Sequence, residues 1–162
     1  MKSEDKLVFE KLIEELKNDP RALQMKEFVQ HGKVSTYDHC LAVSKMSYLL
    51  GRHFKVDHRS LVKGSFLHDY FLYDWHEKVG THHGKMHPHR ALINAERDFG
   101  LTEKEKGIIR CHMWPLTLKS VPDSKEAAIV CFADKVVSLK ETVVGFAGKV
   151  GSVFVAFERV KV

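Results

Sequence analysis

The chain has 162 residues, of which 44% are hydrophobic, and this length and composition predict one globular domain over residues 1–162. No apolar run approaches the roughly 20 residues that span a bilayer, and the charged N-terminal residues do not resemble a signal peptide, so we expect a cytoplasmic protein without membrane contact. The formal charge of +5 suits a small anionic partner. Nucleic acid is a less favoured partner, because Lys and Arg alternate with acids along the chain.

Helix start and stop signals recur along the chain and predict an all-α fold, a single-domain helical bundle. In chain order, we expect a helix over residues 4–17, a second from Pro20 to near Gly32, and a third from an N-cap at Ser35 to about Gly51. A fourth helix is expected to begin after Asp57 and to reach the His68-Asp69 pair.

Helical periodicity fails after Asp69, where a long, histidine-rich connection precedes Pro88. Such a connection within a compact domain is often functional. Pro88 is expected to begin the next helix, and capping boxes at Thr102 with Glu105 and at Asp123 with Glu126 are expected to open the last two helices. Beyond residue 145 the sequence is compatible with a strand, a helix or a frayed end.

Three polar residues interrupt the apolar faces of three predicted helices. His39 shares a stripe with Val43 and Met46, His112 lies on the face of two isoleucines, and Asp134 lies among valines. A buried histidine is often satisfied by a backbone carbonyl, but a buried carboxylate needs a counter-charge. No Lys or Arg shares the stripe of Asp134, so we expect a cation from outside the chain.

Imidazole and carboxylate ligands together suit divalent Mn, Fe, Co, Ni or Zn more than Mg or Ca. The adjacent His68 and Asp69, at the end of an apolar helix, add one ligand of each kind to such a site. The three cysteines, an odd number without a C-x-x-C pair, indicate neither a disulfide framework nor a zinc knuckle.

The order His39, His68-Asp69, His112 and Asp134 on successive helices resembles the HD superfamily of metal-dependent phosphohydrolases. The resemblance covers about residues 35–140. It implies a helical bundle around a metal centre in which His39, His68, Asp69 and Asp134 bind a first divalent metal ion.

Dinuclear members of the superfamily imply a second metal ion, which His87 and His112 would bind, with Asp69 bridging both ions. Asp69, His87 and His112 are thereby the expected catalytic residues. His83 competes with His87 as a ligand. We prefer His87, because it precedes Pro88 at an expected helix N-cap, whereas His83 precedes Gly84.

The chain lacks the GYP tripeptide of the cyclic-di-GMP phosphodiesterases and the HD-x-x-ED pattern of the ppGpp hydrolases. The resemblance therefore implies a small phosphate-containing substrate, such as a nucleotide, without identifying it. Arg90 and Lys135 are the candidate phosphate contacts, and both also fit the description of ordinary surface cations.

Three functions agree with this ligand set. The leading hypothesis is hydrolysis of a phosphomonoester or phosphodiester by a metal-activated water. The second is oxygenation, because the resemblance includes di-iron oxygenases with similar ligands. The third is a structural or regulatory site in a sensor domain that binds a nucleotide without turnover. The sequence does not indicate the oligomeric state.

Overall fold

The computed structural model describes residues 3–31, 33–74 and 83–159, and its side chains over residues 3–30, 33–74 and 86–145. The fold is all-α, as the sequence predicts. The helices are α1 (Ser3–Lys17), α2 (Pro20–Leu23), the 3-10 turn η1 (Gln24–Glu27), α3 (Thr36–Gly51), α4 (His58–Phe66), α5 (His83–Phe99), α6 (Glu103–Cys111) and α7 (Lys125–Arg159).

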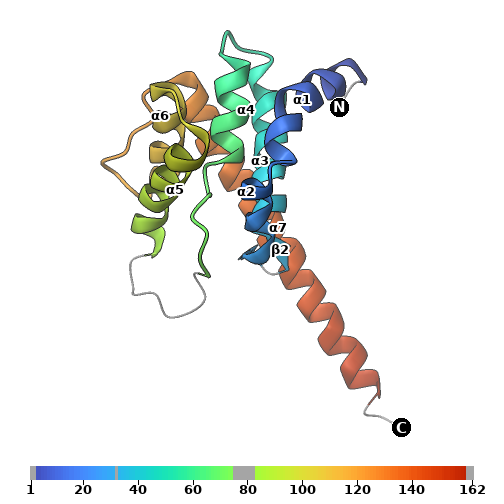
Figure 1. Ribbon diagram of the computed structural model, residues 1–162. Coiled ribbons are helices and arrows are strands. Elements are labelled where there is room, and N and C mark those ends of the chain that lie inside the picture. Colours follow the sequence, from blue (N-terminus) through green and yellow to red (C-terminus); the bar gives the residue numbers. More distant parts are fainter. Residues whose placement is uncertain (1–2, 32, 75–82, 160–162) are drawn as a thin grey trace.

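The bundle is organised around α3, which packs against α4 and α7, while α6 lies against both α4 and α7. Helix α5 packs mainly against α6, at the edge of the bundle. One apolar cluster joins α1, α3 and α4 through residues such as Phe9 and Phe66, and a second joins α4, α6 and α7 through Leu61, Ile108 and Val130. Figure 1 shows α7 crossing behind α4 and continuing well beyond the other helices.

Local capping explains where several helices begin. The Ser35 side chain accepts a hydrogen bond from the amide of Asp38, and the Asp57 carboxylate accepts from the amides of Arg59 and Ser60. Thr102 and Glu105 form the expected capping box at the start of α6. These contacts satisfy backbone donors that a helix leaves without an internal partner.

The predicted second helix is too long. After α2 and η1 the chain forms a small antiparallel hairpin of β1 (Val29–His31) and β2 (Val34–Ser35). The β-branched Val29 and Val34 favour strands and flank a glycine, a combination typical of a turn. The hairpin matters for the site because β1 carries Gln30, which is buried.

Three other helix boundaries differ from the sequence prediction. Helix α5 begins at His83, so Pro88 lies inside it and the expected N-cap position of His87 is wrong. Helix α4 ends at Phe66, and His68 and Asp69 follow in a turn. At the start of α7 the cap is Ser124, whose hydroxyl accepts from the amide of Ala127 at 3.1 Å.

The expected capping box of Asp123 with Glu126 does not form. The Glu126 carboxylate instead accepts hydrogen bonds from the Asp57 amide at 2.8 Å and from the Lys104 ammonium at 3.1 Å. These partners link the starts of α4 and α7, a long-range contact that a local sequence signal does not reveal. Helix α7 then continues through residue 145 to Arg159, a region for which the sequence made no prediction.

Candidate metal centre

Five segments bring buried histidine and aspartate side chains together in the centre of the bundle. His39 comes from α3 and His87 from α5, His68 and Asp69 follow α4, His112 caps the end of α6, and Asp134 lies on α7. All six side chains are buried. The periodicity argument that turned His39, His112 and Asp134 towards the core is therefore confirmed.

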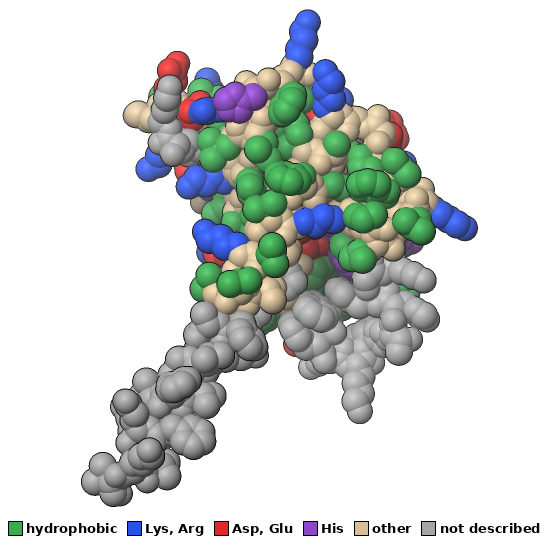
Figure 2. Space-filling model, turned by 180° about the vertical axis from the view of Figure 1, so that it is seen from behind, with side chains coloured by type: hydrophobic (Ala, Val, Ile, Leu, Met, Phe, Trp, Pro, Cys, Tyr) green, Lys and Arg blue, Asp and Glu red, His purple; other side chains and the backbone are tan. Residues whose placement is uncertain are grey.

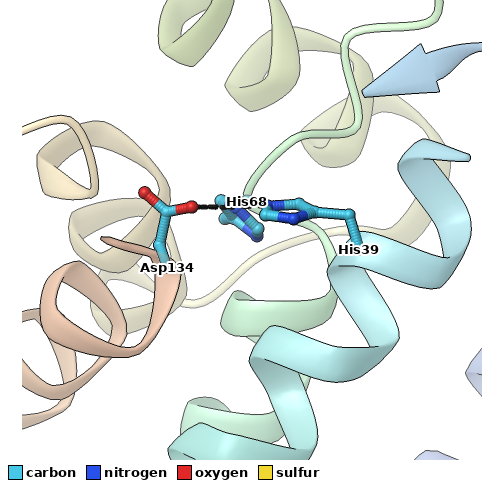
Figure 3. Close-up of side chains that lie close together, drawn as sticks. All are labelled: His39, His68 and Asp134. Carbon is cyan, nitrogen blue, oxygen red and sulfur yellow. Dashed lines mark ion pairs between the residues drawn. The ribbon is translucent and has the colours of Figure 1, made fainter. Parts of the chain in front are cut away.

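One group of ligand atoms forms around Asp134. Its Oδ1 atom lies 3.3 Å from His39 Nε2 and 3.6 Å from His68 Nε2. Figure 3 shows the two imidazole rings and the carboxylate converging from three different segments of the chain. Asp69 approaches the same two rings with Oδ2, at 3.4 Å from His68 and 3.8 Å from His39.

A second group forms on the other oxygen of Asp69. His87 Nε2 and His112 Nε2 each lie 3.3 Å from Asp69 Oδ1, and the two nitrogens are 2.9 Å apart. The carboxylate of Asp69 thus lies between two pairs of histidines. Its Oδ2 faces His39 and His68, and its Oδ1 faces His87 and His112.

Backbone carbonyls orient two of the histidine rings. His68 Nδ1 donates to the carbonyl of Ser65 and His112 Nδ1 donates to that of Ile109, both at 2.7 Å. In each case the acceptor is three residues earlier, so the end of a helix holds the ring. When Nδ1 donates, Nε2 keeps a lone pair that can bind a metal ion. This is the usual arrangement of metal-binding histidines.

Glu141 and Gln30 are among the side chains that contact this centre and that the sequence analysis missed. Glu141 Oε2 lies 2.9 Å from His39 Nδ1, and Gln30 Nε2 donates to Asp69 Oδ2 at 2.5 Å. Glu141 follows Asp134 by seven residues on the same helix, so helical spacing from Asp134 was a usable signal. Gln30 carried no such signal, since its segment was expected to be helical.

The histidines and aspartates of the centre stabilise one another's charged forms, which shifts their pKa values in opposite directions. Burial opposes a charge on His39, but hydrogen bonds that its ring donates to the carboxylates of Asp134 and Glu141 raise its pKa to about 10. Burial likewise opposes the raised pKa of His68, which the charge of Asp69 and other neighbours produce. The pKa values of Asp69 and Asp134 are lowered although burial would raise them, because histidines surround both carboxyl groups. The carboxylates therefore favour positive charge in this buried space.

The donor atoms fit a divalent metal ion. Within the described part of the chain, His68 Nε2 and Asp69 Oδ1 are buried without a hydrogen-bond partner, which is costly for polar atoms away from water. The ligand atoms of His39, His68 and Asp134 all lie within 4.8 Å of one another, as do those of His68, Asp69 and His112. Both clusters could hold a metal ion, and their nitrogen and oxygen donors suit a transition metal.

The remaining candidate residues lie around this centre. Arg90 is exposed on α5, with its guanidinium 5.1 Å from the centre of the Tyr73 ring. Lys135 donates to the carbonyl of His112 at 2.8 Å. His89 is exposed, and the side chain of His83, the competitor of His87, lies outside the described residues.

A bundle of helices surrounds buried groups of histidine and aspartate side chains that could hold a metal ion. The HD domain family model matches residues 36–139, which is more than half of the chain, and the protein belongs to this family. HD domains bind divalent metals and are typical of metal-dependent phosphohydrolases. Comparisons with curated proteins and with solved structures find no match. Among the helices whose residues the structure describes, none combines the length and apolar composition of a membrane span.

Proposed function

We propose that the protein is a dinuclear metal-dependent phosphohydrolase that acts on a nucleotide or another small phosphate ester. The observation that carries the proposal is the position of Asp69, whose two carboxylate oxygens face two separate pairs of histidine nitrogens. A bridging carboxylate is a common ligand in sites that hold two metal ions close together.

In this proposal His39, His68 and Asp134 bind the first divalent ion, His87 and His112 bind the second, and Asp69 binds both. When bound, the two metals supply a water of lowered pKa and neutralise the charge that develops on a phosphate ester during hydrolysis. Asp69, His87 and His112 are the residues that would hold the second metal beside that water, and they are the proposed catalytic residues.

The protein's own contribution is orientation and exclusion of bulk water. The carbonyls of Ser65 and Ile109 hold His68 and His112 with Nε2 towards the centre. The side chains of Gln30 and Glu141 contact Asp69 and His39, respectively, and hold these two ligands in place. Such supporting hydrogen bonds fix ligand geometry and raise metal affinity.

Two cations are proposed for different tasks. Arg90 lies three residues after His87 on α5, hence on the same side of the helix, and its exposed guanidinium is the proposed phosphate contact. The ammonium of Lys135 is engaged with the carbonyl of His112, and we assign it to the support of that histidine rather than to substrate.

The experiment that tests this proposal combines elemental analysis with an activity panel. Purified protein is reconstituted separately with Mn, Fe, Co, Ni and Zn, and each form is assayed against phosphomonoesters and phosphodiesters, nucleotides included. We expect two metals per chain and metal-dependent release of phosphate or a nucleoside monophosphate. A mixed-valent iron signal with oxygen consumption would contradict hydrolysis and favour an oxygenase. Nucleotide binding without turnover by any metal form would favour a sensor.

A further inference from the structure

The outward side of α7 carries an apolar stripe opposite the metal centre. Phe132, Val136, Leu139 and Val143 are 57%, 37%, 67% and 57% exposed, respectively. Asp134 on the same helix points into the bundle instead. Figure 2 shows the molecule from behind, the side on which α7 crosses the bundle, and hydrophobic side chains gather over the middle of this face.

The spacing along the stripe follows the heptad period of a coiled coil. Successive members are separated by four, three and four residues, and the same alternation continues in the sequence through Phe146, Val150, Val153 and Phe157. Each of the two positions recurs every seven residues, at 132, 139, 146 and 153 and at 136, 143, 150 and 157, which is the repeat of a left-handed coiled coil. A heptad pattern kept over three to four repeats is typical of helices that pair with other helices.

The residue types along the stripe suit pairing with an identical helix. The first heptad position is valine at 136, 143 and 150, and the other holds larger side chains such as Phe132 and Leu139. β-branched residues at the first position with leucine at the second favour two-stranded coiled coils, and Val136, Leu139 and Val143 match this preference, whereas the second position elsewhere holds Phe132, Phe146 and Val153. A two-fold axis places a stripe against its own copy, so an apolar stripe is complementary to itself.

We propose that this stripe of α7 binds the same stripe of a second copy of the chain, forming a homodimer through a two-helix coiled coil. The stripe is accessible to a partner, because its four members from Phe132 to Val143 are 37–67% exposed. The stripe lies on the side of α7 opposite Asp134, so the proposed dimer interface does not cover the metal centre of either copy.

The charged residues beside the stripe predict how the dimer responds to salt. Lys135 and Lys140 lie at the two heptad positions beside Leu139, and a parallel pair brings Lys135 of one helix near Lys140 of the other; Lys135 contacts the carbonyl of His112 but its side chain is still 39% exposed. Salt screens this repulsion while the apolar contact persists. The dimer is therefore expected to tighten as the salt concentration rises, the opposite of an association driven by opposite charges.

The test is sedimentation velocity of the metal-loaded full chain over a wide range of concentration, with Leu139→Lys as the disrupting variant. A lysine in the seam places a charge in an apolar contact, and we expect the dissociation constant to rise at least about 100-fold. Leu7→Lys is the matched control, because Leu7 is also a leucine on an exposed helix face, 73% exposed on α1. The unmodified chain and this control should both be dimers.

Val143→Lys provides a second disruption further along α7, and circular dichroism with metal content verifies that each variant is folded. A monomeric unmodified chain would overturn the proposal, as would a dimer that survives both α7 substitutions. A monomer that binds vesicles of anionic phospholipid would overturn it in favour of a lipid surface. Since metal content and activity are measured on the same samples, this result is independent of the proposed hydrolysis.

Discussion

Two regions of the bundle supply the ligands of the candidate metal centre, and they pack differently: α3, α4, α6 and α7 form the central part, whereas α5 packs mainly against α6. His39, His68 and Asp134 come from α3, the end of α4 and α7, which pack against one another through the interior. His87 comes from α5, which packs mainly against α6 at the edge. Ligands from the central helices are therefore part of the core, and we expect a change of His87 to disturb that packing less.

This difference predicts that the first half of the candidate centre, formed by His39, His68 and Asp134, couples metal binding to folding. His87, in the second half, is expected to couple it mainly to catalysis. A metal that binds only the folded state stabilises it by mass action. The following substitutions test the contrast, in order of decreasing expected effect.

Asp134→Ala removes a buried carboxylate from the first half, and we expect it to abolish metal binding and activity. A metal present at 1,000 times its dissociation constant stabilises the fold by about 4 kcal/mol. For a domain of this size that loss corresponds to a fall in melting temperature of about 10 °C. Elemental analysis and thermal denaturation measure both effects.

The control for this change is Asp123→Ala, an exposed aspartate just before the same helix, which should retain the metal and the activity. A chelator should lower the melting temperature of the unmodified chain in the same way. Persistence of the metal in Asp134→Ala would show that the first half is assigned wrongly.

His87→Ala is expected to leave about one metal per chain, a folded protein and no hydrolysis, because the water is no longer held between two cations. The matched control is His89→Ala, two residues away on α5 with an exposed side chain, which should keep both metals and full activity. Metal counts are compared side by side after reconstitution. Equal counts in the unmodified chain and in His87→Ala would contradict the dinuclear centre.

Glu141→Gln tests the support of His39 without removing a ligand. The neutral amide is a weaker partner for His39 Nδ1, and loss of such outer contacts lowers metal affinity or activity by about 10–100-fold. We expect this loss to affect the first metal and to leave the fold intact. Metal titration monitored by calorimetry measures it, with Glu103→Gln, an exposed carboxylate on α6, as the control. An unchanged metal affinity would indicate that Glu141 does not support metal binding through His39.

Thr102→Ala removes the N-cap of α6, the helix that ends at His112, and gives the smallest expected effect. Loss of a threonine cap costs about 1 kcal/mol. The melting temperature should fall by about 2–4 °C. Metal content should not change, because the cap lies at the far end of the helix from His112. Thr102→Ser should restore the stability, and a loss of metal in Thr102→Ala would argue that α6 as a whole is held less firmly than we infer.

The sequence by itself determined the all-α fold, most helix starts and the inward direction of His39, His112 and Asp134. These features depend on short-range physics, since capping side chains bond to amides two or three residues away and helical periodicity decides which face is apolar. The ordered histidines and aspartates likewise pointed to the HD superfamily, to which the chain belongs.

Only the tertiary structure decided which side chains meet. The division of the two Asp69 oxygens between two pairs of histidines depends on where α5 and α6 pack relative to α3. The contact of Gln30 with Asp69 depends on a hairpin that replaces an expected helix. Periodicity fixes the direction of a side chain on its own helix but not the residue across the core, because that partner is set by packing between segments distant in the sequence.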